Sequence, residues 1–235
     1  MHRFSLLSGW RPVALAMAAT TLLAPLAVPA AANSPKAPEF GPVIEEFADY
    51  EGQKRCKPKP KPGTQALADL LTATYPDTTW IGISRACDIG GTSEHKEGRA
   101  LDWARDATNP AQRNTVSEFL DWLFATDNHG NENAMFRRLG IMYLIWNRRI
   151  WSTWDGDWDV YCVQKKRKCK DPDSKAALHP HTDHVHISLG WDGARMETSY
   201  WNPTLSMEDG QPPPGPEESP PPAEEEEPTS PDRIG

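Results

Sequence analysis

Two short segments of the sequence contain residues that could bind a metal ion. Residues 93–102 read Ser-x-His-x-x-Gly-x-Ala-x-Asp and supply His95 and Asp102. Residues 181–186 read His-Thr-Asp-His-Val-His and offer His181, His184 and His186 as further imidazole ligands. Two imidazoles and one carboxylate are sufficient for a catalytic zinc ion, which keeps three protein ligands and one open position for water. The chemistry that such a site supports is hydrolysis.

The spacing within each segment indicates which side chains share a face. Strands are expected over Arg99–Ala104 and His184–Leu189, and residues two apart on a strand project to the same side. If these strands are neighbours, one ion could be surrounded by His95, Asp102, His184 and His186. An isolated histidine is more often a hydrogen-bonded core or surface residue. Five of the seven histidines lie in or beside the two segments, however, which weakens that interpretation.

The remaining pattern predicts a mixture of helices and strands. Helices are expected over Gln65–Thr74 with Thr64 as N-cap, from the Asn109-Pro110 pair onward, and from Asn131 to Gly140. Strands are expected over Thr79–Ser84 and in a hairpin that pairs Ile141–Trp146 with Ile150–Trp154. Because these elements do not alternate regularly, the predicted class is α+β.

Composition divides the 235 residues into four parts. Residues 1–32 have basic residues, then an apolar run and small residues, which predicts a secretory signal peptide rather than a membrane span. Residues 33–39 are expected to be a linker and residues 40–207 the folded domain. Residues 208–235 are rich in proline and glutamate and predict a disordered tail. The mature protein is expected to be secreted and monomeric.

The charge is unevenly distributed. The tail carries nine acidic residues and one arginine, so the formal charge of −8 belongs to it, and residues 1–207 balance at zero with 24 acidic and 24 basic groups. This balance does not indicate a nucleic-acid-binding domain. Two basic clusters remain. Their members are Lys54, Arg55, Lys57, Lys59 and Lys61, and Lys165, Lys166, Arg167, Lys168 and Lys170. We interpret both as solvated loops, with contact to anionic envelope polymers as the alternative.

Four cysteines follow the expected signal peptide, and an even number in an exported chain favours disulfides. Three pairings are open. Proximity along the chain favours Cys162 with Cys169, which leaves Cys56 with Cys87.

Several of the tryptophans lie within Trp146–Trp158. Packing in the core and the hairpin is the simplest interpretation. An aromatic wall for a sugar or a peptide is the alternative.

Residues 93–102 resemble the first metal motif of the LAS-type zinc peptidases. This group includes D-alanyl-D-alanine carboxypeptidases, phage endolysins and murein endopeptidases, and it shares a fold with the Hedgehog signalling domain. Residues 181–186 are similar to the second motif of the murein endopeptidase branch. The resemblance covers about residues 80–104 and 179–190. It implies a Hedgehog-like domain with a small antiparallel sheet and flanking helices.

The resemblance also implies roles for individual residues. His95, Asp102 and His186 would bind Zn²⁺, and Asp183 would act as general base toward water and then protonate the leaving amine. His184 would stabilise the oxyanion or orient the base, and His181 would assist proton transfer. Arg85 would engage a substrate carboxylate, and Ser93 would hydrogen-bond the peptide.

The resemblance therefore predicts a secreted zinc peptidase that cuts the stem peptides of peptidoglycan. Only seven residues separate Arg85 from Ser93, whereas the carboxypeptidase branch has a long helical insert there. A wall-binding module that keeps the metal with weak or no turnover is therefore the alternative. A metal-dependent phosphoesterase is a third hypothesis. It would require more carboxylates near the ion, and the sequence has only one His-x-Ser, at residues 186–188.

Overall fold

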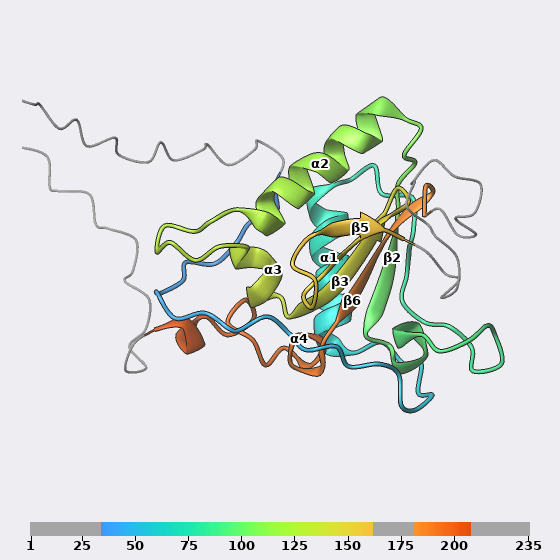
Figure 1. The fold of residues 1–235 in the computed structure, drawn as a ribbon, viewed down its shortest axis with the longest axis horizontal. Helices are drawn as coiled ribbons and strands as arrows, with labels where there is room; N and C mark the ends of the chain where they lie inside the picture. The colour runs from blue at the N-terminus through green and yellow to red at the C-terminus, as the bar shows by residue number, and fades with distance from the viewer. Residues whose placement is uncertain (1–33, 162–180, 208–235) are drawn as a thin grey trace, which may run out of the picture. The chain divides into compact units, whose positions relative to one another are not determined.

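One antiparallel sheet of six strands organises the computed structural model, which describes residues 34–161 and 181–207 (Figure 1). The strands lie side by side in the order β1-β2-β6-β3-β4-β5. Their bounds are β1 Ile81–Gly82, β2 Ala100–Ala104, β3 Ile141–Trp146, β4 Arg149–Ser152, β5 Trp158–Val160 and β6 His184–Leu189. The strand that comes last in the chain, β6, therefore lies between β2 and β3 in the middle of the sheet.

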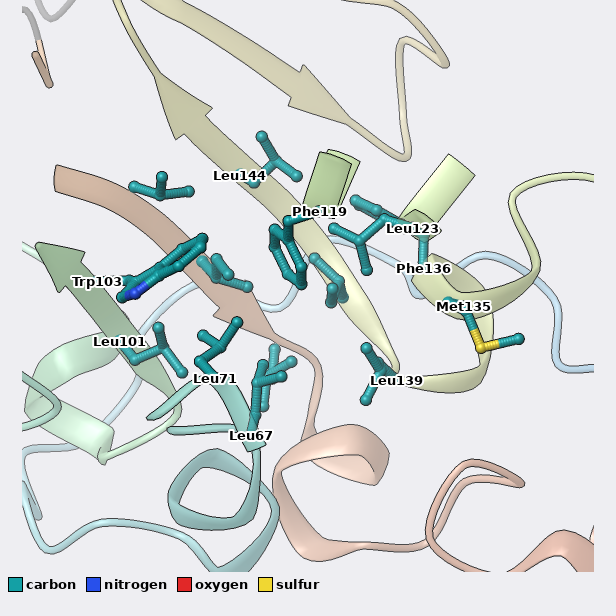
Figure 2. Packing of buried hydrophobic residues seen from close by; sticks show 14 of the residues in the cluster. Leu67, Leu71, Leu101, Trp103, Phe119, Leu123, Met135, Phe136, Leu139 and Leu144 are labelled. Carbon is teal, nitrogen blue, oxygen red and sulfur yellow. The ribbon is translucent and has the colours of Figure 1, made fainter. Parts of the chain in front are cut away.

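Four α-helices and two short 3₁₀ helices accompany the sheet in the described residues. They are α1 Pro62–Thr74, η1 Glu94–Glu97, α2 Pro110–Phe124, α3 Ala134–Arg138, α4 Trp191–Arg195 and η2 Pro203–Ser206. Figure 2 shows leucines of α1 and the aromatic and leucine side chains of α2 packed against β2 and β3. A small antiparallel sheet with flanking helices is consistent with the predicted α+β class.

Alternation along the central strands gives the sheet two chemically different faces. Leu101 and Trp103 of β2 join Val185 and Ile187 of β6 in the hydrophobic core under the helices. The residues between them, including Asp102 and His186, project to the opposite face. The helices thus make one face of the sheet a rigid core and leave the other face free for polar side chains.

The predicted helices exist, but two of the predicted starts are wrong. Helix α1 begins at Pro62, and Thr64 lies buried inside its first turn, because proline is already suited to the first helical position. Asn109 caps α2 as predicted, accepting hydrogen bonds from the backbone of Ala111 and Gln112. The start of α3 is at Ala134 rather than near Asn131.

Asn131 does not cap α3 because its side chain is used elsewhere. Its amide donates to Asp127 and to the carbonyl of Pro42. The predicted helix end is close to the observed one, since α3 ends at Arg138 and Gly140 follows with a φ of 65°.

The predicted hairpin is confirmed with small changes in its bounds. Asn147 and Arg148 form a two-residue turn with φ of 44° and 68°, which is typical of the type I′ turn that joins twisted strands. Strand β4 ends at Ser152, two residues earlier than expected, and β1 keeps only two of the six residues expected there. Trp146 and Trp151 are buried as expected for packing, whereas Trp154 is half exposed.

Residues 34–61 form no helix or strand and are held against the sheet by buried arginines. Arg138 donates to the carbonyls of Gly41 and Val43. Arg99 donates to the carbonyl of Glu51 and forms a buried ion pair of 2.9 Å with Glu97. The Glu97 carboxylate in turn accepts from the backbone N–H groups of residues 54 and 55.

The disulfide Cys56–Cys87 fastens the same N-terminal segment to the loop before η1, as predicted. Cys162 and Cys169 lie outside the described residues, as do the expected signal peptide and the acidic tail. Part of the expected linker contacts the domain, since Lys36 accepts a hydrogen bond from Tyr200. In the ranges 34–161 and 181–207, no helix has the length and apolar character needed to cross a bilayer.

Replacing Glu97 by glutamine should destabilise the fold by about 3–5 kcal/mol, because it leaves the fully buried Arg99 without a counter-charge. Urea denaturation at pH 7 measures this, with the exposed Glu132→Gln as control. Burial opposes ionisation of Glu97, but hydrogen bonds from residues 54, 55 and Arg99 outweigh it and lower its pKa. The contribution of the ionised Glu97 to the free energy of unfolding is therefore complete above the ordinary glutamate pKa. It is lost as the pH falls through the lowered pKa of Glu97 in the folded protein. Equal stability of the two variants at pH 7 would contradict this role.

Candidate metal centre

The pairing of β2 with β6 brings the two predicted metal motifs together. Asp102 lies directly opposite His186 in the antiparallel register, and both project to the face away from the helices. His95 comes from η1, which immediately precedes β2. Gly98 ends η1 in a left-handed conformation with φ of 67°, and a side chain there would collide with the carbonyl of Lys59. The glycine of the first motif therefore lets the chain turn from His95 back to Asp102.

The ligand atoms of His95, Asp102 and His186 converge on one point. His95 Nε2 lies 3.1 Å from Asp102 Oδ1 and 3.2 Å from His186 Nδ1, and His186 Nδ1 lies 2.8 Å from Asp102 Oδ1. A tetrahedral shell with bonds of 2.0–2.1 Å separates its ligand atoms by about 3.3 Å. The three residues could therefore hold a metal ion with little movement.

The second nitrogen of each imidazole is fixed by a neighbour. His95 Nδ1 donates to the carbonyl of Ile83 at 2.7 Å, and His186 Nε2 lies 3.0 Å from Ser188 Oγ. When a metal ion replaces the hydrogen bonds of both rings to Asp102, these contacts would favour the tautomers that turn the lone pairs of His95 Nε2 and His186 Nδ1 toward the ion. Metal-binding histidines are commonly oriented in this way. The candidate centre therefore combines three residues that could hold a metal ion with groups that orient the two imidazoles.

The ionisation states also suit a cation. Burial alone would raise the pKa of Asp102, but hydrogen bonds with His186 and His95 outweigh it and hold that pKa well below its ordinary value. Burial lowers the pKa of His186, and the neighbouring Asp102 only partly opposes this. At neutral pH the centre thus presents a carboxylate and a neutral imidazole, which are the forms that bind metal ions.

A chain of hydrogen bonds behind His186 includes three residues to which the sequence analysis gave no role at the metal centre. Ser188 links His186 to the hydroxyl of Tyr143, which donates to the buried Glu94 at 2.7 Å. Burial, reinforced by Glu94, raises the pKa of Tyr143 well above its ordinary value, so this phenol keeps its proton. Ser188 could have been found from its two-residue spacing to His186. Tyr143 and Glu94 could not, because β3 becomes a neighbour of β6 only through the strand order.

The other residues of the second motif lie at the edge of the centre. His184 Nδ1 is 2.9 Å from Asp183 Oδ1, and His184 Nε2 is 3.6 Å from Asp102 Oδ1. The Asp183 side chain is 82% exposed, whereas that of Asp102 is 17% exposed and those of His95 and His186 are buried. The ring of His181 lies 4.7 Å from that of His184 and 6.0 Å from that of His186. All three predicted catalytic residues therefore border the metal-binding group.

The predicted substrate-binding residues line the same cavity as Asp102 and His186. Arg85 donates to Ser93 Oγ at 3.3 Å, and the backbone N–H of Ser93 is held by Gln53. This arrangement holds the guanidinium of Arg85 at the cavity wall. Ser93 is buried and orients Arg85.

One cavity of about 580 Å³ joins these groups. Its lining combines the two motifs with residues of β3 and with described residues next to residues 162–180. The lining residues are Arg85, Thr92, Ser93, Glu94, Asp102, Tyr143, Ile145, Tyr161, His181, Thr182, Asp183, His184 and His186. Asp102 and His186 are thus accessible from a polar cavity that could admit a small part of a polymer.

Residues 56–177 match the model of the family described as VldE, C-terminal domain. The chain belongs to this family. The match includes the first metal motif with His95 and Asp102, and it ends before the second motif with His186. No curated protein and no solved structure matches the chain.

Removal of one ligand should abolish metal binding without unfolding the protein. With Zn²⁺ as the probe, the metal-free wild type should bind one ion at the centre, and His186→Ala should lose at least about 100-fold in affinity because only two ligands remain. Isothermal titration calorimetry measures both. His129→Ala is the matched control, since His129 contacts the carbonyl of Phe40 far from the centre along the chain. Unchanged affinity in His186→Ala would refute this ligand set.

Proposed function

We propose that this protein is a zinc-dependent peptidase that hydrolyses the stem peptides of peptidoglycan. The observation that carries the proposal is the convergence of His95, Asp102 and His186, of which Asp102 and His186 line a polar cavity. The arginine and the acidic residue that the resemblance to LAS-type peptidases requires line the same cavity. The family match neither supports nor opposes this activity.

Different residues around the centre would carry out different steps of peptide hydrolysis. A bound Zn²⁺ would supply Lewis acidity, which lowers the pKa of a coordinated water to about 7. Arg85 would bind a carboxylate of the stem peptide, because its guanidinium can form two parallel hydrogen bonds to that group. Asp183 would accept a proton from the attacking water and return it to the leaving amine.

The contact between Asp183 and His184 gives the proton a defined route. Asp183 Oδ1 accepts a hydrogen bond from His184 Nδ1. The other ring nitrogen, His184 Nε2, points toward Asp102 at the centre. Asp183 would therefore act either directly or by keeping His184 oriented and basic. In both cases the loss of the Asp183 carboxylate should reduce turnover and leave metal binding intact.

A wall-binding module with little turnover remains the second candidate. The exposure of Asp183 favours it, since this carboxylate is engaged by His184 and is not buried beside the ligands. A phosphoesterase has less support, because the metal-binding group of the described residues contains a single carboxylate.

The setting proposed for this activity is outside the cytoplasm. The expected signal peptide and the disulfide Cys56–Cys87 are both typical of exported proteins. We propose a secreted or wall-associated monomer whose partner is the peptide of peptidoglycan.

Purified protein should release fragments from muropeptides in a metal-dependent manner. Cleavage should stop on removal of the metal with a chelator and return on addition of Zn²⁺, because the centre is then reconstituted. Mass spectrometry of the products measures this and identifies the bond. Absence of cleavage of any stem peptide by the zinc-loaded protein would contradict the peptidase proposal and leave the binding module.

Asp183→Asn should lower the cleavage rate by about 100- to 10,000-fold while the bound zinc stays at one ion per chain. His184→Gln distinguishes the two proton routes. A loss equal to that of Asp183→Asn indicates that the two residues act as a pair, and a loss below about tenfold indicates that Asp183 acts directly. An Asp183→Asn enzyme as fast as the wild type would place the base elsewhere.

A further inference from the structure

A second cavity, of about 480 Å³, is lined mainly by cationic side chains. We call it the basic cavity. Its lining residues are Lys54, Arg55, Lys57, Lys61, Glu97, Trp191 and Arg195. Four of the five cations come from one of the two basic clusters of the sequence, and Arg195 comes from α4. From the sequence, this cluster could have been a solvated loop. The fold instead arranges its cations around a concave surface.

The backbone that carries these cations is held in place. The disulfide at Cys56 fixes its middle, and the N–H groups of Lys57 and Lys61 donate to the carbonyls of Lys96 and Gly98. Glu97 binds the N–H groups of Lys54 and Arg55. The cationic wall is thus organised before any ligand binds, which reduces the entropy lost on binding.

The cations of the basic cavity are largely uncompensated. The acidic residue of the lining, Glu97, is already paired with the buried Arg99. Within residues 34–161 and 181–207, no ion pair joins an acidic side chain to Lys54, Arg55, Lys57 or Lys61, and Arg195 has only a 3.7 Å contact to Glu197. A concave surface with several unpaired cations concentrates anions.

Trp191 adds an aromatic surface to the cavity. Its ring is partly exposed, and Lys61 and Arg195 lie 5.8 Å and 4.9 Å from its centroid. An indole can stack on the apolar face of a sugar ring while neighbouring cations bind the charged substituents of the sugar. This combination fits a charged saccharide better than a free inorganic anion.

We propose that the basic cavity binds an anionic glycan, a saccharide chain that carries phosphate or carboxylate groups. The helix η1 connects this cavity to the metal centre, since Glu94 lines the cavity at the metal centre and Glu97 lines the basic one. A glycan held here would keep the protein at its polymer while the metal centre remains free. Glycan binding is separate from hydrolysis and does not require the peptidase proposal to hold.

The test measures binding of the full mature chain to phosphomannan, polygalacturonate and neutral dextran by affinity electrophoresis. The wild type should be retarded by at least one anionic polymer and not by dextran, and added salt should weaken the retardation. The polymer that binds identifies phosphate or carboxylate as the recognised group. Equal retardation by dextran, or none by either anionic polymer at low salt, would overturn the proposal.

Two triple variants distinguish binding at the basic cavity from binding that depends only on the net charge of the protein. Lys57→Glu/Lys61→Glu/Arg195→Glu should weaken binding by at least about tenfold. The matched control Lys165→Glu/Lys166→Glu/Lys168→Glu makes the same charge change in the other basic cluster and should weaken it by less than about threefold. An equal loss of affinity in the two triple variants would show that binding depends on net charge and would refute the proposed site. Retained zinc binding in each variant shows that it is folded.

A footprint of the wild type provides a test that needs no variant. Bound polymer should protect Lys57 and Lys61 from acetylation and leave the exposed Lys36 reactive. Protection of Lys57 and Lys61 before polymer is added would overturn the proposal in favour of the acidic residues 208–235 as the occupant. Protection of none of these lysines by a retarding polymer would also refute it.

Discussion

The antiparallel pairing of β2 with β6 is the constraint on which the candidate site depends. It places Asp102 directly opposite His186, although 83 residues lie between them in the sequence. The opposite side of each strand contributes Leu101, Trp103, Val185 and Ile187 to the core under the helices. A shift of the register by one residue would exchange these faces and bury the ligands in the core. The hydrophobic core therefore fixes the geometry of the metal centre.

The spacing of the two motifs predicted that His95, Asp102, His184 and His186 would meet, and the structure brings them together, but local patterns did not predict their surroundings. The two-residue period of β6 and the turn at Gly98 follow from the sequence, and so does the helix that Asn109 caps. Thr64 and Asn131 looked equally suitable as caps. They failed because Pro62 already starts one helix and Asp127 engages the amide of Asn131. Which residue caps a helix thus depends on its neighbours in the folded structure, and local sequence propensity does not describe those contacts.

The groups that support the site arise from strand order and from long-range contacts. Tyr143 reaches Ser188 only because β3 lies next to β6, and the carbonyl that orients His95 comes from Ile83, before η1. The basic cavity likewise combines one cluster with Trp191, far along the chain. Its cations are visible in the sequence, whereas their arrangement around a concave surface depends on the disulfide and on Glu97.

The central claim is that three side chains from two distant segments bind one metal ion. A crystal structure of the zinc-loaded protein, with anomalous diffraction recorded at the zinc absorption edge, tests it most directly. The account predicts one strong peak within about 2.0–2.2 Å of His95 Nε2, Asp102 Oδ1 and His186 Nδ1. A peak held instead by His181 and His184, or the absence of a peak between β2 and β6, would contradict it.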